Sequence, residues 1–410
     1  MTTHRFFQFL FLPLFALTLS SCFNWAARAV EKLPEKSTLN RAYDYEGKVV
    51  IIGAGSAGLA AANILEKNNI SYVVLEATSR YGGRLKKDTT LADFPIDMGA
   101  EWIHSNPAVL ELLRRPDRKQ DELISYQLDE SVVWDGQRLK PLSKSFMKAY
   151  YNFMPESKFK RSTWYDFFDQ NIAQNVKHNI IYNAAVSSID YSSEKVVIRD
   201  RNGIAYECDK VLVTVPIGVL QSGMIAFNPT MDAKKVEAIQ SISFPTGFKV
   251  AMKFSEKFYP DVINLKGIGG ENVYYDIAFK KEANAHILGY LCLGGQAKIY
   301  DALGSEKAII NKLLEQLDTM YDGKASELYT GEYRFENWGK HEYTQGTWTQ
   351  AFQEKKSALK TLAEPLDSKV YFAGEIFDPY QQMGVPGALL SGFHSVDKML
   401  GEIEGSKRKF

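Results

Sequence analysis

Cysteine is scarce in this sequence, and an excess of charge of either sign is missing. The 410 residues include three cysteines, too few for a disulfide framework or a cysteine-based metal cluster. The 49 basic and 49 acidic residues cancel, so no overall field attracts nucleic acid or an anionic membrane. Repeats and low-complexity tracts are absent too. We therefore expect neither a metal site nor a nucleic-acid partner.

A hydrophobic run long enough for a confident membrane span is also lacking. The apolar run Phe6–Leu19 is short and typical of a signal peptide. The LSSC sequence that ends at Cys22 resembles a bacterial lipobox, and Ala27–Ala29 resembles a competing cleavage site. Either site predicts export to the periplasm or cell envelope, with membrane contact only through a lipid on Cys22. An uncleaved anchor or a wrongly assigned start codon is the remaining alternative. We expect residues 1–22 to be the signal peptide and 23–46 a linker.

The strongest pattern in the chain is a strand–helix–strand unit that ends at Glu76. Val49–Ile52 predicts a buried strand, Ala57–Lys67 a helix, and Ser71–Leu75 a second strand. Glycines at G-x-G-x-x-G spacing join the first strand to the helix: Gly53, Gly55 and Gly58. They permit a tight turn, close approach of a pyrophosphate and close helix packing. Glu76 can accept hydrogen bonds from a ribose, which favours FAD or NAD over NADP. The alternative is a glycine-rich turn without a ligand.

The chain is too long for one compact core, so two or three lobes are expected. Lys210–Pro216 predicts a buried strand, Phe248–Lys253 a strand with two different faces, and Ser305–Asp318 an amphipathic helix. The aromatic residues of Ser162–Val176 predict core packing rather than a cofactor site. Asn106–Arg138 is rich in charge and predicts a solvated helix–loop region.

Taken together, the ordered motifs resemble the FAD-dependent amine oxidases, the group of monoamine, polyamine and spermine oxidases and lysine-specific histone demethylases. The resemblance runs from Lys48 to about Leu400. The matching segments are GAGSAGL with Glu76, GGR at 82–84, DMGAEWIH at 97–104, TVPIGVL at 214–220, FAGE at 372–375 and GALLSG at 387–392. The resemblance implies an α/β fold with a Rossmann-like FAD-binding domain (47–105, 178–228 and 345–402). It also implies a discontinuous α+β substrate domain (106–177 and 229–344).

The resemblance further implies a set of cofactor-binding residues drawn from the whole chain. They are Gly53, Gly55, Ser56, Ala57, Gly58, Glu76, Ala77, Gly83, Arg84, Gly99, Ala100, Glu101, Trp102, Val186, Pro216, Trp338, Gly374, Glu375, Gly384, Val385 and Ala388. Thr347 stands where some monoamine oxidases have a cysteine that bonds to the flavin. The FAD is therefore expected to be non-covalent.

Four residues are expected to take part in catalysis or substrate binding: Lys249, Trp348, Glu101 and His104. In the family, a strand lysine at the place of Lys249 binds a water beside flavin N5 and assists the reaction with O2. Trp348 matches one wall of an aromatic cage, whereas the other wall falls near Gly384, unless Tyr380 or Met383 fills it. Glu101 or His104 could hold the distal ammonium of a polyamine.

The implied reaction is oxidation of a primary or secondary amine, polyamine-like or monoamine-like. Hydride passes from the α-carbon of the amine to flavin N5 and leaves an imine, which water hydrolyses to an aldehyde. O2 then reoxidises the flavin and gives hydrogen peroxide. Two alternatives remain at this stage. One is a flavoprotein desaturase or dehydrogenase that acts on C–C bonds, and the other is a catalytically silent flavin-binding lipoprotein.

Overall fold

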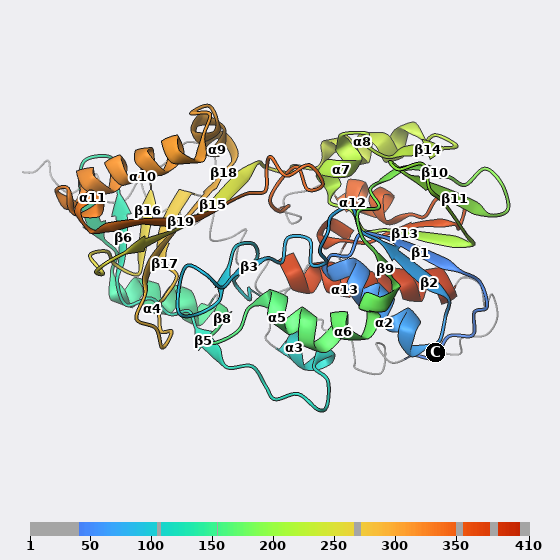
Figure 1. Cartoon of the computed structure of the whole chain (residues 1–410), viewed down its shortest axis with the longest axis horizontal. Helices are drawn as coiled ribbons and strands as arrows, with labels where there is room; N and C mark the ends of the chain where they lie inside the picture. Colours follow the sequence, from blue (N-terminus) through green and yellow to red (C-terminus); the bar gives the residue numbers. More distant parts are fainter. Residues whose placement is uncertain are drawn as a thin grey trace, which may run out of the picture.

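The structure is a computed structural model that describes residues 41–104, 108–153, 155–265, 272–349, 356–377 and 384–401. The predicted signal sequence and Cys22 lie outside the described residues. Within these ranges, no helix has the length and apolar character needed to cross a membrane. The described elements form two lobes side by side, one built on a parallel sheet and the other on a larger mixed sheet (Figure 1).

A five-stranded sheet, parallel throughout, forms the centre of the first lobe. Its strands, in spatial order, are β20 (Val370–Phe372), β13 (Lys210–Val213), β1 (Val49–Ile52), β2 (Tyr72–Leu75) and β9 (Ile180–Ile181). All four residues of β1 are buried, as expected for a parallel strand covered on both faces. Val49 and Ile51 face one hydrophobic core, and Val50 and Ile52 face another. The predicted strand–helix–strand unit is therefore present, with α2 at Ser56–Lys67.

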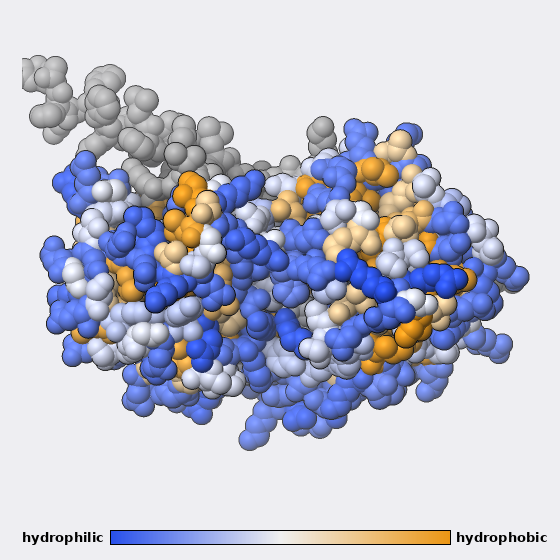
Figure 2. All heavy atoms as spheres, turned by 45° about the horizontal axis from the view of Figure 1, so that its top comes forward, coloured by the Kyte–Doolittle hydropathy of each residue, from blue (hydrophilic) through white to orange (hydrophobic). Residues whose placement is uncertain are grey.

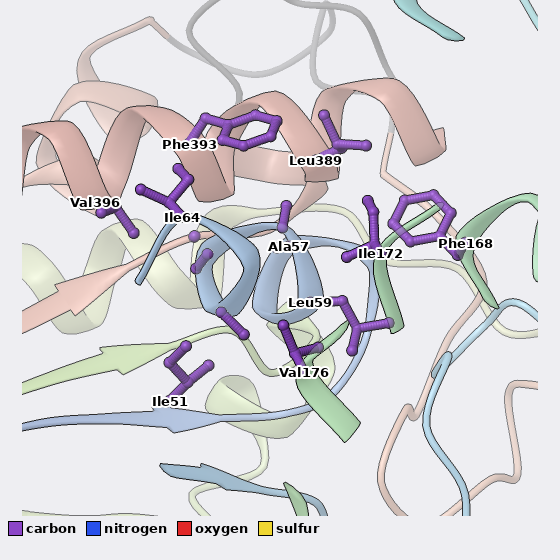
Figure 3. Close-up of a cluster of buried hydrophobic side chains, with 14 of the residues drawn as sticks. Ile51, Ala57, Leu59, Ile64, Phe168, Ile172, Val176, Leu389, Phe393 and Val396 are labelled. Carbon is purple, nitrogen blue, oxygen red and sulfur yellow. The ribbon is translucent and has the colours of Figure 1, made fainter. Parts of the chain in front are cut away.

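The first of these cores joins the two ends of the described chain. Helix α13 (Gly384–Gly401) packs along α2, with Phe393 and Val396 near Ile64 (Figure 3). A Cβ on Gly392 would lie 2.4 Å from the carbonyl oxygen of Ala57. The backbones of the two helices can therefore approach only because residue 392 has no side chain. This contact places the GALLSG segment beside the glycine-rich turn.

The opposite face of the parallel sheet is covered by helices and a small second sheet. The helices are α7 (Ile217–Gln221), α8 (Ala233–Ser241) and α12 (Lys356–Ala363). The four strands, in order, are β12 (Ala205–Cys208), β11 (Val196–Asp200), β10 (Val186–Asp190) and β14 (Ala226–Asn228). Cys208 is buried in this second core.

A seven-stranded mixed sheet forms the second lobe. Its strands, in order, are β19 (Tyr329–Asn337), β15 (Gly247–Phe254), β18 (His286–Leu293), β17 (Asn272–Asp276), β16 (Val262–Leu265), β6 (Ser131–Trp134) and β7 (Leu139–Pro141). Helices α9 (Gly294–Asp301), α10 (Glu306–Tyr321) and α11 (Lys324–Leu328) lie over one face (Figure 1). Helix α4 (Lys144–Phe153) packs toward the other. The predicted amphipathic helix is confirmed as α10, whose cap residue Ser305 accepts a hydrogen bond from the backbone of Ala308.

The prediction for Asn106–Arg138 is wrong in part. The segment contains α3 (Ala108–Leu113), but it also contains β5 (Leu123–Ser125) and β6. Strand β6 pairs in parallel with β16, and β5 pairs with β8 (Ser157–Phe159). These partners are remote in sequence, so the local excess of charge concealed short strands that depend on distant pairing.

The aromatic residues predicted as core between β8 and β9 are confirmed as core. They lie on α5 (Trp164–Phe168), where Trp164 is 1% exposed, and η2 (Asp169–Ala173) and α6 (Gln174–Val176) follow and add Ile172 and Val176 to the same core. The short elements β3 (Lys87–Asp88), β4 (Ile96–Asp97), η3 (Lys177–Asn179) and η5 (Glu375–Phe377) complete the fold. On the face drawn in Figure 2, hydrophilic residues predominate and hydrophobic ones gather in small separate patches.

Candidate active site

One cavity of about 870 Å³ extends from the parallel sheet to the mixed sheet. Ile52 and Glu76 line one end of it, and Val262, Tyr275 and Leu291 line the other. Side chains from both lobes therefore face the same space. A site of this size, mostly apolar with a few polar groups, is typical of a bound organic cofactor and substrate.

The glycine-rich turn at the end of β1 forms an open cradle. Gly53 has φ +104°, and a Cβ on Gly58 would lie 1.9 Å from the carbonyl oxygen of Gly53. A Cβ on Gly55 would have no neighbour within 4 Å, and Gly55 caps α2 without a side-chain hydrogen bond. The cap thus offers no side-chain acceptor to the first N–H groups of α2, and Gly55, Ser56 and Ala57 at this end of the helix line the cavity. This geometry fits a pyrophosphate.

Glu76 stands at the end of β2 and is 7% exposed. Its Oε2 accepts a hydrogen bond from the backbone of Ala54 (2.9 Å), and its Oε1 accepts two from Thr78 (2.9 and 2.7 Å). These bonds fix the carboxylate on the cavity wall. Each carboxylate oxygen can accept two hydrogen bonds, so Oε2 retains capacity for a ribose hydroxyl.

Arg84 joins the glycine-rich loop to the C-terminal part of the chain. Its Nη1 lies 2.8 Å from Oε2 of Glu375 and also donates to the carbonyl oxygen of Thr347. The guanidinium lies over the ring of Phe244, 5.5 Å from the centroid. Oε1 of Glu375 accepts bonds from the backbone and hydroxyl of Thr349. One edge of the guanidinium is therefore held by protein groups, which orients the rest of it at the cavity.

Gly99 occupies a position where a side chain cannot fit. A Cβ there would lie 1.7 Å from the carbonyl oxygen of Arg84 and 3.3 Å from the ring of Trp338. The indole of Trp338 donates to the carbonyl oxygen of Met98 (3.1 Å) and is 5% exposed. The segment 97–104 is thereby pressed against the cavity wall.

The cavity wall carries nearly all of the predicted cofactor residues. They are Gly53, Gly55, Ser56, Ala57, Glu76, Ala77, Gly83, Arg84, Gly99, Ala100, Glu101, Trp102, Val186, Pro216, Trp338, Gly374, Glu375, Gly384, Val385 and Ala388. Gly58 lies behind the wall, where it allows α2 to pack against β1. Segments far apart in the sequence thus meet at one site.

Lys249 is buried, not a surface strand residue, with an exposed fraction of 2%. Its Nζ lies 2.6 Å from Oε2 of Glu101 and donates to the carbonyl oxygen of Asp97. Lys158, which the sequence did not single out, lies 2.6 Å from Oε1 of the same carboxylate. The hydroxyl of Tyr275 donates to Oε2 of Glu101 (2.8 Å). Lys249 and Glu101 both line the cavity.

These contacts change the role expected for Glu101. Both of its oxygens already serve protein ammonium groups, so it has no free charge to offer a distal substrate ammonium. Burial raises the pKa of the Glu101 carboxyl, but the charges of Lys158 and Lys249 outweigh it and hold the pKa below the usual value. Burial, together with repulsion by Glu101, raises the pKa of Asp97 and favours its uncharged form.

A carboxylate that the sequence did not reveal lines the cavity. Glu156 lines it together with His104, and its Oε1 lies 2.9 Å from Nδ1 of His104. The Glu156 side chain is 22% exposed and that of His104 is 42% exposed. Tyr126 and Tyr151 line the same region. Unlike Glu101, which is 4% exposed, Glu156 is a partly exposed carboxylate on the cavity wall.

The expected aromatic cage is represented by Trp348, which lines the cavity. Gly384 stands on the wall with φ +61° and open space where a Cβ would be. The two residues considered as replacements for the second wall, Tyr380 and Met383, lie outside the described residues. Thr347 is 4% exposed and its hydroxyl donates to the carbonyl oxygen of Pro245 (2.9 Å). That the FAD is bound non-covalently stays a prediction.

Other residues of the wall were missed because no motif marks them. His341 packs on Trp338 (5.8 Å between ring centroids), and burial lowers its pKa. Phe244 and Tyr343 also line the cavity. Within the described ranges, no group of acidic, histidine and cysteine side chains could hold a metal ion.

A parallel sheet with a glycine-rich cradle, a buried lysine and a shared two-lobe cavity define a dinucleotide-dependent oxidoreductase. The family model described as "Flavin containing amine oxidoreductase" matches residues 56–163 and 147–400. The chain therefore belongs to the flavin-containing amine oxidoreductases, and its cofactor is FAD. As a member of this family, it is an oxidoreductase that acts on amine donors.

Relatives share modest identity along most of the chain. Lysine-specific histone demethylase 2 of Homo sapiens is 25% identical over 447 residues, covering 87% of this chain. The match spans 54% of that relative, so this chain aligns with about half of its length. Probable polyamine oxidase 4 of Arabidopsis thaliana is 24% identical, covering 88% of this chain and 89% of the relative.

Among solved structures, wild-type putrescine oxidase bound to putrescine is similar in fold. The TM-score is 0.70 at 16% identity, covering 87% of this chain and 99% of that one. The predicted fold, a Rossmann-like FAD-binding domain with a second substrate-binding part, is confirmed. These similarities do not favour a desaturase or a silent binding protein.

Proposed function

We propose that this protein oxidises di- or polyamines, with O2 as the electron acceptor. The observation that carries the proposal is a carboxylate, Glu156, on the same cavity as Lys249 and the dinucleotide cradle. Bound FAD would take a hydride from the α-carbon of the amine and pass the electrons to O2, giving an imine and hydrogen peroxide. The residues of this chain bind, orient and desolvate the amine.

The part of the cavity beside Lys249 is aromatic. The ring centroids of Trp102 and Tyr275 lie 5.6 and 5.7 Å from Nζ of Lys249, and the two rings pack together at 4.9 Å. Trp348 and Tyr126 line the same cavity. A dry aromatic wall disfavours an ammonium ion and so favours the neutral amine, which is the form that can give up hydride. The charged end of a longer substrate needs a different environment, which Glu156 supplies at the more exposed end.

An amine panel tests the proposal on the purified FAD-loaded protein. Diamines and polyamines should bleach the flavin absorbance under anaerobic conditions and give peroxide in air. Glu156→Gln should raise KM for a diamine about tenfold and leave a monoamine of equal chain length unaffected, because a charge-assisted hydrogen bond of about 1.5–3 kcal/mol is lost.

The matched control is Glu122→Gln, which removes an acid that is 58% exposed and pairs with Lys160. It should leave both KM values at the wild-type level. Absence of flavin reduction with every amine would refute the oxidase. An equal rise in KM for the monoamine and the diamine in Glu156→Gln would refute the role of Glu156.

We further propose that the protein is exported and held at the cell envelope by a lipid on Cys22. The support is the apolar run Phe6–Leu19 followed by Leu19-Ser20-Ser21-Cys22. Cells grown with a radiolabelled fatty acid should label the wild-type chain and not Cys22→Ser. Soluble protein whose N-terminus follows Ala29 would instead show cleavage at the alternative site.

A further inference from the structure

Lys158 is a buried cation that does not reach the cavity wall. It is 1% exposed, on strand β8. Two backbone hydrogen bonds between Ile103 and Ser157 (2.8 and 3.2 Å) lay the segment after Glu101 alongside this strand. The Lys158 ammonium thus meets Oε1 of Glu101 at 2.6 Å, whereas Oε2 meets Lys249.

One carboxylate therefore serves two ammonium groups. Two positive charges and one negative charge leave these three groups with one excess positive charge. Aromatic faces stabilise it: Nζ of Lys158 lies 5.1 Å from the ring centroid of Tyr126 and 5.7 Å from that of Tyr275. Nζ of Lys249 lies 5.7 Å from the same Tyr275 ring. Cation–π contacts of this kind support a buried ammonium.

The arrangement decides how much charge Lys249 presents to the cavity. A carboxylate paired with Lys249 alone would cancel its charge and leave a neutral pair beside the flavin site. Lys158, which is not among the residues that line the cavity, compensates the charge of Glu101 through its other carboxylate oxygen. The Lys249 ammonium then keeps its net charge where negative charge develops on reduction of the cofactor and of O2.

We propose that Lys158 is a positioning residue for Lys249, because it neutralises Glu101 from behind and so keeps a net positive charge at the flavin site. The inference rests on the proposed function, since it concerns the same site. Lys158 would act through Glu101, since its own side chain does not line the cavity.

Sulfite binding to the oxidised FAD-loaded protein tests the charge without turnover. Sulfite adds to oxidised flavin as an anion, so a nearby positive charge tightens its binding. Lys158→Met should weaken sulfite binding, read from the flavin absorbance, by about tenfold. Reoxidation by O2 should slow by a similar factor, while kcat for anaerobic flavin reduction stays within twofold.

Two further variants separate charge from packing. Lys158→Arg keeps the charge and should retain most of the wild-type sulfite affinity. The double variant Lys158→Met with Glu101→Gln leaves Lys249 as the only charge of the three groups, so sulfite affinity should return toward wild type. If Lys158 had only a structural role, the double variant should bind sulfite more weakly than either single variant.

Unchanged sulfite affinity in folded Lys158→Met would overturn the proposal, and so would failure of the double variant to recover. If Lys158→Met does not fold, the sulfite affinity of the double variant is compared with that of the wild type. Affinity close to the wild-type value supports the proposal, and a clear loss overturns it. A protein that binds sulfite as expected but oxidises no amine would refute the proposed function and leave this inference standing.

Discussion

Replacing Lys249 by methionine is expected to slow the reaction of the reduced enzyme with O2 by about 10²-fold. The rate at which an amine reduces the oxidised enzyme should change only a few-fold. The reason is electrostatic: Lys249 is the ammonium that lines the cavity beside Trp102, and electron transfer to O2 creates negative charge there. Methionine has similar length without the charge. Stopped-flow absorbance of the flavin measures the two half-reactions separately.

Lys253→Met is the matched control for this experiment. Lys253 lies on the same strand, but its side chain is 30% exposed and pairs with the half-exposed Glu332. Both half-reactions should keep their wild-type rates in this variant. Reoxidation of Lys249→Met at the wild-type rate would contradict the role of the ammonium.

Removing the charge of Glu101 is expected to be the most destabilising single change at the site. Glu101 is 4% exposed, and Glu101→Gln leaves Lys158 and Lys249 buried without their counter-charge. Loss of one partner of a buried ion pair costs about 3–5 kcal/mol. Urea unfolding followed by circular dichroism should show a loss of this order in the free energy of unfolding.

The corresponding surface change is Glu332→Gln, which removes the partner of Lys253. Its cost should be below about 1 kcal/mol, because solvent screens an exposed pair.

The contribution of Glu101 to the free energy of unfolding should also depend on pH. Its folded pKa is below the unfolded value of 4.5, so the contribution is present above that pH and is lost as pH falls through the folded pKa. A Glu101→Gln variant as stable as wild type would contradict the buried ion pairs.

The sequence predicted those elements whose signal is local. Val49–Ile52 is a strand as predicted, and the predicted helix Ala57–Lys67 begins one residue earlier in the structure. Glycine positions also carry a local signal, because the turn at Gly53 and the close packing at Gly58 leave no room for a side chain. The family motifs extended these predictions to the last helix.

What the sequence did not reveal depends on contacts between distant segments. Strand β6 exists because it pairs with β16, more than a hundred residues later. Glu156 and Lys158 belong to no motif. Glu156 pairs with His104, and Lys158 pairs with Glu101, both of which lie much earlier in the sequence. A charged residue is expected to be exposed to solvent, and only the structure shows that it is buried against a partner.

The sequence by itself determined the class of protein, because the FAD-binding motifs are short, ordered and tied to local backbone geometry. It also determined that Lys249 follows a strand pattern that the family uses. Only the tertiary structure decided that Glu101 is shared between two lysines and that Glu156 lines the same cavity as Lys249. Charge compensation depends on distances in space, which spacing along the chain does not specify.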